Sequence, residues 1–302
     1  MERYNHLNTY LKEKFGERTL KICIDAGFTC PNRDGTKGVG GCIFCGERGS
    51  GEHLKNIDIA EQVKKHLESY RGERANKFIV YFQNFTNTYD TIDNLKKKYN
   101  SALIDERIVG IQVATRPDCI DEDIAKLLHS YSIKYYVCVE LGLQTVNETT
   151  GKLINRCYTN DDFVNAVNIL RKYNIDVVTH IMVGLPGESH EDIVNSVNFV
   201  NNLDIQGLKI HSTYVTNDTK LNKMYEEGTY SPISLDYYLD ELCYIITHIR
   251  KDIILHRISG DAPKDMLVAP SWNSHKKFVL NGIDKILRER DLNQGMYYSV
   301  EE

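Results

Sequence analysis

Three cysteines form the part of the sequence whose residue types and spacing most clearly indicate chemistry. In the stretch CPNRDGTKGVGGCIFC, eleven residues separate Cys30 from Cys42, and two residues separate Cys42 from Cys45. A C-x-x-C pair lets two thiolates reach one metal centre. The glycines between the first two cysteines favour a loop that can wrap around a bound group. Closed structural zinc sites use four protein ligands, so three thiolates would leave one coordination position open.

Two other interpretations of these cysteines stay open. A zinc site could combine the three thiols with Cys23 or His53. Disulfides are disfavoured, because nothing in the sequence indicates export: the first residues, MERYNHLNTYLKEKFGER, lack the apolar stretch of a signal peptide. No run of about 18 apolar residues predicts a membrane span. We therefore expect a cytoplasmic protein without membrane contact, whose eight cysteines are thiols.

Segments with strand and helix patterns alternate along the chain and must position this loop. Apolar segments predict strands at 20–25, 78–82, 108–113, 135–141, 175–183 and 208–215. Amphipathic segments predict helices at 7–15, 57–70, 91–103, 121–130 and 235–250, with further helices after Thr159 and Ser189. Continuous apolar strands alternating with helices indicate a parallel sheet covered on both faces. The pattern alone does not choose between an open sheet and a barrel.

The domain division expected from this pattern has three parts. Residues 1–19 form an N-terminal helical segment, and 20–252 form the α/β core. Residues 253–302 form an extension that packs on the barrel and adds a strand and a helix to close it. About 50 residues make a poor independent core, so this extension is not expected to be a separate domain.

Composition limits the classes of function. The chain has 302 residues, of which 41% are hydrophobic and 26% are charged, as in ordinary globular proteins. A net charge of −5 argues against a protein that coats nucleic acid by bulk charge. It leaves room for a local basic face, and the segment 276–290 is one candidate. A solvated helix surface is the alternative for that segment.

The cysteine stretch, with Phe44 beside the last cysteine, resembles the cluster loop of radical S-adenosylmethionine (SAM) enzymes. Its long C-x11-C-x2-C spacing is similar to that of the YhcC/YtqA family, which is related to the radical domain of the Elongator catalytic subunit. The resemblance implies an α/β fold with a partial (β/α)6 TIM-like barrel. It also implies that Cys30, Cys42 and Cys45 hold a 4Fe–4S cluster whose open iron binds SAM, and that a flavodoxin- or ferredoxin-type protein supplies electrons.

Polar side chains follow the second and third strands, where ligands bind in parallel α/β folds. The loop QNFTNTY at 83–89 carries Gln83, Asn84 and Thr86. The resemblance implies that this loop meets the amino group of the cofactor, although the sequence departs from the Gly-Gly-Glu form of the family. After the third strand, Arg116 could hold a carboxylate or phosphate of a substrate. The alternatives are an ordinary turn for 83–89 and an ion pair with Asp118 or Asp121 for Arg116.

The fourth strand predicts a buried carboxylate. Glu140 lies in an apolar segment, where an unpaired charge is costly. The resemblance implies that Glu140 accepts hydrogen bonds from the ribose of SAM, that Gln144 lines the cavity, and that Arg156 pairs with the cofactor carboxylate. A buried salt bridge is the alternative for Glu140, and a surface position is the alternative for Arg156.

The fifth and sixth strands complete the predicted site. His180 and the tight loop Gly184-Leu185-Pro186 match, by resemblance, the position that contacts the adenine of the cofactor. Lys209 and His211 alternate with an apolar residue, so both are expected to face the barrel interior and contact the substrate. A structural polar layer is the alternative for these two residues.

The sequence thus predicts a radical SAM enzyme. The family resembled is associated with tRNA modification, and implies conversion of a carboxymethylaminomethyl group on the wobble uridine towards aminomethyl. Contacts to tRNA would come from the barrel rim, from 276–290, and from stacking on exposed tyrosines or Trp272. The alternatives are a radical SAM enzyme acting on a small metabolite and a zinc-binding α/β protein that is not an enzyme.

Overall fold

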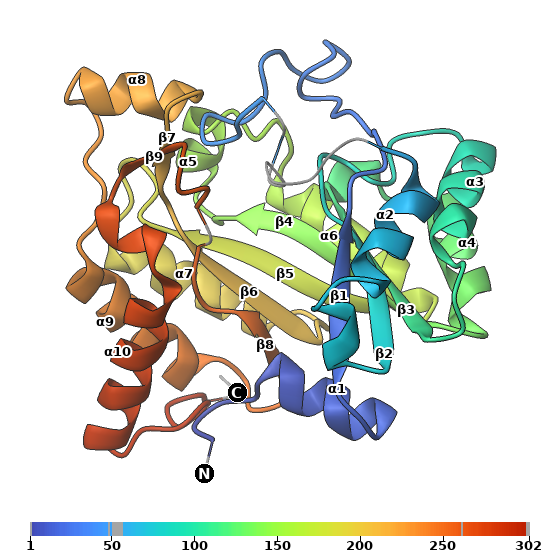
Figure 1. Ribbon diagram of the computed structural model, residues 1–302. Helices are drawn as coiled ribbons and strands as arrows, with labels where there is room; N and C mark the ends of the chain where they lie inside the picture. Colours follow the sequence, from blue (N-terminus) through green and yellow to red (C-terminus); the bar gives the residue numbers. More distant parts are fainter. Residues whose placement is uncertain (1, 48, 50–56, 261, 300–302) are drawn as a thin grey trace.

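A parallel sheet forms the centre of the structure, a computed structural model that describes residues 2–47, 49, 57–260 and 262–299 (Figure 1). The order of its seven strands is β1-β2-β3-β4-β5-β6-β8. Their bounds are Thr19–Ile24, Lys77–Phe82, Ile108–Thr115, Tyr136–Gln144, Asp176–Val183, Gly207–Ser212 and Ile254–Arg257. Every neighbouring pair is parallel. The six predicted strands are therefore confirmed, with ends that differ by a few residues.

Helices follow the strands as the apolar patterns predict. The longer helices are α1 (Leu7–Phe15), α2 (Ile59–Leu67), α3 (Ile92–Ala102), α4 (Glu122–Ser132), α6 (Asn160–Lys172), α7 (His190–Asn201), α9 (Leu235–His248) and α10 (Lys276–Glu289). Short helices α5 (Glu148–Leu153) and α8 (Lys220–Glu226) lie near the cysteine loop (Figure 1). Capping boxes fix the first turns of α6 and α7, because the side chains of Thr159 and Ser189 pair with backbone groups three residues on.

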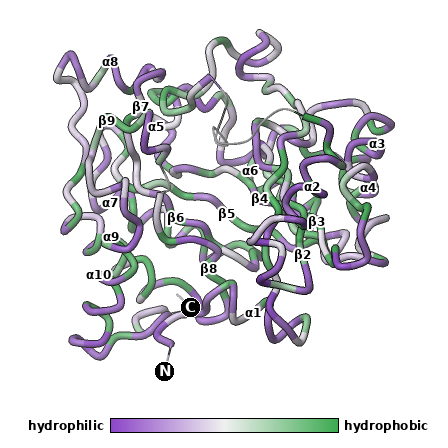
Figure 2. Tube along the Cα trace, in the orientation of Figure 1, coloured by the Kyte–Doolittle hydropathy of each residue, from purple (hydrophilic) through white to green (hydrophobic). Residues whose placement is uncertain are grey.

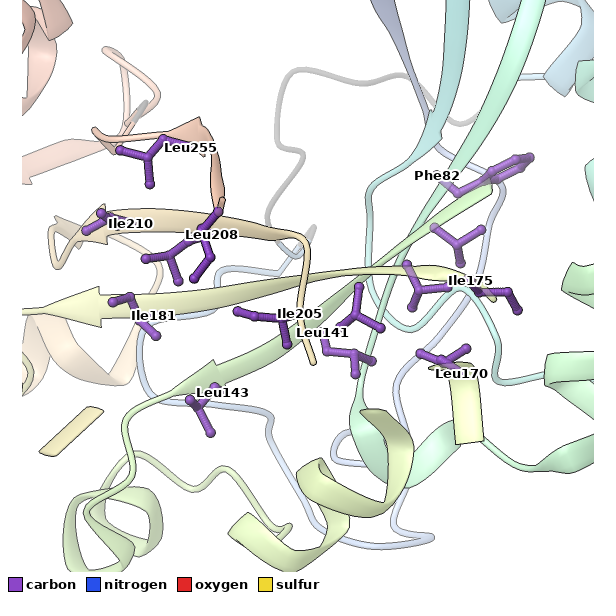
Figure 3. Close-up of a cluster of buried hydrophobic side chains, with 14 of the residues drawn as sticks. Phe82, Leu141, Leu143, Leu170, Ile175, Ile181, Ile205, Leu208, Ile210 and Leu255 are labelled. Carbon is purple, nitrogen blue, oxygen red and sulfur yellow. The ribbon is translucent and has the colours of Figure 1, made fainter. Parts of the chain in front are cut away.

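One face of the sheet holds the main apolar core. Alternate residues of successive strands, including Phe82, Leu141, Ile181, Leu208 and Leu255, are buried together (Figure 3). Hydrophobic segments follow the strands, whereas hydrophilic residues are frequent on the helices and outer loops (Figure 2). Burying each large apolar side chain contributes about 1.5–3 kcal/mol, so this face stabilises the fold.

The opposite face of the sheet is concave and polar. The ammonium of Lys209 in β6 lies 3.2 Å from the hydroxyl of Tyr81 in β2. These strands are four positions apart, and a flat sheet would separate them by about 19 Å. The contact therefore requires the sheet to curl into a half-barrel, as the predicted partial barrel implies. We call the space enclosed by the concave face the lumen.

The C-terminal part adds a strand but leaves the sheet open. Strand β8 pairs with β6, so β1 and β8 are the two edges of the sheet within the described residues. The expectation that 253–302 closes the barrel is therefore wrong. A second, two-stranded sheet joins β7 (Val215–Thr216) to β9 (Leu267–Ala269). The domain bounds at 19 and 252 stay predictions.

Candidate functional site

The cysteine loop leaves the carboxyl end of β1 and contains neither helix nor strand between Cys30 and Cys45. The amide of Cys45 donates to the carbonyl of Cys42 at 3.0 Å, which turns the C-x-x-C pair. Burial raises the pKa of Cys42 to about 12, and the neighbouring Cys45 and Cys30 contribute in the same direction. The three sulfur atoms are thus electrostatic neighbours, as the motif predicts. His53, the other zinc candidate, lies outside the described residues.

Neutral side chains hold this loop against the turn after α5. The amide of Asn155 donates to the carbonyl of Gly41 at 2.8 Å and to that of Val39 at 3.3 Å. In return, the side chain of Asn32 donates to the Asn155 carbonyl at 2.5 Å, and lies 3.7 Å from the sulfur of Cys42. Asn32 is fully buried, so its hydrogen bonds are strong constraints on the loop.

The donor set of the loop fits an iron–sulfur cluster better than a single metal ion. Among the described residues, no group of three or more His, Cys, Asp or Glu side chains is arranged to hold one ion. Cys23 lies within β1, where the charges of Lys21 and Arg257 in the lumen act on it. In a 4Fe–4S cluster, each cysteine bonds a different iron, so the sulfur atoms need not converge on one point. Three neighbouring thiols without carboxylates match that chemistry.

The loop after β2 lies beside the cysteine loop. The amide of Asn84 donates to the carboxylate of Asp25 at 2.9 Å, just beyond the end of β1. The backbone of Thr86 donates to Thr29, and that of Gln83 to Ile24. Asn84 and Thr86 are buried, whereas Gln83 is half-buried. The structure therefore brings the predicted residues of 83–89 to the edge of the sheet from which the cysteines depart.

Arg116 forms the ion pair that was the alternative to substrate contact. Its guanidinium makes two hydrogen bonds of 2.9 Å to Asp118, and it also donates to the carbonyl oxygens of Arg156 and Cys157. Arg116 is only 7% exposed. These contacts connect the loop after β3 to the loop after α5, and favour a structural role for this arginine.

Arg156 is a buried structural residue, so the alternative of a surface position is wrong. All its N–H groups find protein acceptors, which are the carbonyl oxygens of residues 143, 145 and 158 and the side chains of Glu148 and Asn160. Arg156 fixes the turn after β4 and has no N–H left for a cofactor carboxylate. Gln144 adopts a left-handed conformation with φ 60°, and its side chain accepts a hydrogen bond from Tyr158.

Glu140 is the centre of a buried polar network in the lumen. Its carboxylate accepts from Lys209 at 2.6 Å, from Tyr81 at 3.0 Å and from Gln112 at 3.1 Å. Burial alone would raise the pKa of Glu140, but Lys209, with help from His180, lowers it to about 2. Glu140 is therefore ionised at neutral pH. The buried salt bridge expected as the alternative is present, and its partner is the predicted substrate residue Lys209.

Two histidines complete the wall of the lumen. The rings of His180 and His211 meet edge to face, with 4.4 Å between their centroids. The Nε2 atom of each is buried and has no hydrogen-bond partner among the described residues. Burial and the charge of Lys209 lower the pKa of His180 to about 3, and burial also lowers that of His211. Both imidazoles are neutral, and the predicted inward orientation of Lys209 and His211 is confirmed.

The loop after β5 packs on the cysteine loop through apolar contacts. Gly184 has φ 86°, and a Cβ atom there would approach the side chain of Ile233 to 2.9 Å. Leu185 belongs to a small buried cluster against which Phe44 packs. Pro186 is also buried. The structure thus joins the first and fifth loops, as the predicted site requires.

Sequence patterns missed several residues of the lumen. Tyr81 and Gln112 lie in apolar segments that read as plain buried strands, and only their contacts to Glu140 reveal them. Lys21 could have been found, because a lysine inside an apolar strand is costly unless it faces a polar space. His256 and Arg257 come from β8, which the sequence predicts only as part of an extension.

The chain matches two protein families over most of its length. Residues 30–200 match the Radical SAM superfamily, and residues 205–289 match the Radical_SAM C-terminal domain. The first match covers more than half of the chain and begins at Cys30. The chain therefore belongs to the radical SAM superfamily.

Curated relatives place the chain more closely. YtqA of Bacillus subtilis is 39% identical over 302 residues, which is 98% of this chain and 93% of that protein. YhcC of Escherichia coli is 32% identical and covers 92% of this chain and 90% of YhcC. Within the superfamily, the chain is thus a member of the YhcC/YtqA family.

More distant proteins share the fold or part of the sequence. The structure of Elp3 from Methanocaldococcus infernus has a TM-score of 0.70 at 18% identity, and the match covers 91% of this chain and 64% of that one. A tRNA uridine(34) acetyltransferase from Dehalococcoides mccartyi is 29% identical over 61% of this chain and 39% of its own length. No helix in the described part of the chain is long and apolar enough to cross a membrane.

Proposed function

We propose that this protein is a radical SAM enzyme that holds a 4Fe–4S cluster through Cys30, Cys42 and Cys45. The observation that carries the proposal is the match to the superfamily from Cys30 onward, together with three neighbouring thiols at the carboxyl end of β1. When bound and reduced, such a cluster supplies one electron for cleavage of SAM to methionine and a 5′-deoxyadenosyl radical. The protein's part would be to hold SAM beside a C–H bond of the substrate and to exclude water.

The residues around the cysteine loop would bind SAM. Phe44 and the backbone of Gly184, Leu185 and Pro186 offer an apolar edge for the adenine. Gln83, Asn84 and Thr86 offer amide and hydroxyl groups beside the cysteines. Gln144 at the end of β4 and His180 in the wall of the lumen would complete the set. Glu140 already accepts three hydrogen bonds, so its carboxylate has room for about one more from a ribose hydroxyl. Arg156 is left out of this set, because its donors are occupied.

A protein partner would deliver the electron. A flavodoxin- or ferredoxin-type donor must approach the cysteine loop, since electron transfer requires proximity to the cluster. Exposed residues of the loop, including Lys37, Val39 and Gly40, would form the contact surface.

For the substrate, we propose the wobble uridine of tRNA, whose carboxymethylaminomethyl side chain would be converted towards aminomethyl. Support comes from the partial similarity to tRNA uridine(34) acetyltransferases. Lys276 and Lys277 are exposed and available for phosphates, and Tyr297 is 52% exposed. Trp272 does not suit base stacking, because its ring stacks on Tyr238 and its indole N–H donates to the carbonyl of Ile233.

The first test is anaerobic reconstitution with iron and sulfide. We expect a broad absorption band near roughly 400 nm, and 5′-deoxyadenosine after addition of dithionite and SAM. A colourless protein with stoichiometric zinc would contradict the radical SAM proposal. A second test incubates the enzyme with tRNA that carries the carboxymethylaminomethyl group. Binding should weaken as salt rises. Failure to bind at low salt, with turnover of a small metabolite instead, would favour the alternative substrate class.

A further inference from the structure

The lumen contains more positive than negative charge. Lys209 is paired with Glu140, but Lys21 and Arg257 have neither an ion pair nor a side-chain hydrogen bond among the described residues. The ammonium of Lys21 lies over the ring of Tyr81, 5.3 Å from its centroid. Both side chains are half-buried, and Glu140, the carboxylate that acts on Lys21, is already paired with Lys209. A further negatively charged partner would therefore stabilise these cations.

An irregularity in β8 directs two consecutive side chains towards the lumen. Leu255 points into the apolar core on the other face of the sheet (Figure 3), so alternation alone would send His256 inward and Arg257 back to the core. The register between β6 and β8 shifts at this point, and Arg257 pairs with Lys209. Bulges of this kind re-aim side chains and are frequent next to active sites.

Electrostatic effects agree with this placement of Arg257. After burial and the charge of Lys209, Arg257 further lowers the pKa of His180. Burial raises the pKa of Cys23 in β1, and Lys21 and Arg257 partly offset that rise. Lys21 and Arg257, which come from the two edge strands β1 and β8 of the half-barrel, thus both act on Cys23.

A cavity beside β8, between this strand, the N-terminal segment and α10, can receive a ligand. It measures about 270 Å³ and is lined by His256, Arg257 and Ser259 of the β8 segment, by residues 4 and 6–8, and by α10. A water molecule takes up about 30 Å³, so the cavity is large enough for a small acid group and the water molecules around it. His6 and Lys276 also line it, and no carboxylate does.

We propose that Arg257, assisted by Lys21, binds a carboxylate of the substrate. This inference rests on the proposed radical SAM function and names the substrate group that enters the lumen. A guanidinium matches a carboxylate through two parallel hydrogen bonds. The carboxylate of SAM is the other source of such a group. It belongs at the cysteine loop, whereas Lys21 lies three residues before the end of β1, about 10 Å deeper along the strand.

The experiment compares two anticodon stem–loop RNAs. One carries a carboxymethylaminomethyl group on the wobble uridine, and the other carries its methyl ester. We expect the wild-type enzyme to turn over the acid about 10–100-fold faster than the ester, because the ester leaves Arg257 without its anionic partner. Arg257→Gln should lower turnover of the acid and bring the ratio of acid to ester turnover close to one. Arg257→Lys should restore part of the preference for the acid. Arg107→Gln is the matched control, because Arg107 pairs with Asp105 outside the lumen.

Each outcome has a distinct meaning. An Arg257→Gln enzyme that still discriminates acid from ester overturns the inference. Loss of SAM binding in that variant, measured by equilibrium dialysis, assigns the cation to the cofactor and also overturns it. If the wild-type enzyme acts on neither RNA, the tRNA proposal fails and the anion site is tested separately with acetate and inorganic phosphate. Stabilisation by acetate that Arg257→Gln abolishes supports the site, whereas equal stabilisation of both proteins, or stabilisation by phosphate alone, contradicts it.

Discussion

The cysteine loop and the lumen are built in opposite ways. The loop spans residues 30–45, and neutral asparagine side chains and backbone groups hold it in place. The lumen collects residues from β1, β2, β3, β4, β5, β6 and β8, and a buried ion pair lies at its centre. Its contacts join positions up to 128 residues apart. A substitution in the loop is therefore expected to leave the fold intact, whereas a substitution in the lumen is expected to change the stability of the sheet.

The largest expected effect is on the chemistry of the loop. Replacing Cys42 with Ala should abolish iron binding and 5′-deoxyadenosine formation, because the proposed cluster would lose one of its three ligands. Stability should fall by no more than about 1–2 kcal/mol, since the loop lies outside the main core. Iron content and the absorption spectrum measure cluster binding, chromatography of the reaction mixture measures 5′-deoxyadenosine, and urea unfolding measures stability.

Cys157 offers a matched control for that variant. It is exposed and lies beside the loop, where its sulfur would be 2.9 Å from a Cβ atom on Gly38. Cys157→Ala should keep the iron content and the absorption band. If it loses them as Cys42→Ala does, Cys157 is a ligand and the three-cysteine assignment is wrong.

Breaking the ion pair in the lumen should lower stability without changing the iron content, which is the reverse of the effect expected for Cys42→Ala. Lys209→Met leaves the Glu140 carboxylate buried without its cation, and should lower the free energy of unfolding by about 3–5 kcal/mol. The double variant Glu140→Gln with Lys209→Met removes the charge as well and should recover about 2 kcal/mol of that loss. Urea unfolding with comparison of midpoints and slopes measures both. Iron content should stay unchanged; a loss of iron in Lys209→Met would mean that loop and lumen are not separable.

The same pair predicts a dependence of stability on pH. The pKa of Glu140 is about 2 in the folded protein and about 4.3 when unfolded. Its contribution, about 3 kcal/mol from this difference, is present above about pH 5 and is lost as the pH falls through 4 towards 2. We expect the stability difference between wild type and Glu140→Gln to shrink over this range. If the stability difference between the two proteins stays constant between pH 5 and 2.5, ionisation of Glu140 is not its cause.

The contrast between the regions also explains what the sequence could predict. The cysteine motif, the strands and the capping boxes are patterns within a few residues, and their periodicity is visible directly. The inward orientation of Lys209 followed from alternation in one strand. The partners of Glu140 could not be predicted this way, because Tyr81 and Gln112 meet it only when the sheet curls.

Errors in the prediction have the same origin. The surface position that is the alternative for Arg156 is wrong, because its acceptors include carbonyl oxygens at the turn after β4, which no side-chain pattern encodes. The strand after 252 was expected to close the barrel, and instead it extends one edge. Register irregularities such as that at Arg257 depend on the neighbouring strand, and no local signal in the sequence marks them.

The smallest predicted effect tests how the loop is held. Asn155→Ala removes the amide that supports the carbonyl oxygens of Val39 and Gly41, and it also places alanine at φ 56°, where a Cβ atom is unfavourable. Asn155→Gly removes the same amide without that strain. If the hydrogen bonds matter, both variants should release iron to a chelator faster than wild type, by about 5–10-fold for a loss of about 1 kcal/mol or slightly more. If only Asn155→Ala does so, backbone strain is the cause, and the loop depends on the shape of the turn at 155 more than on its amide.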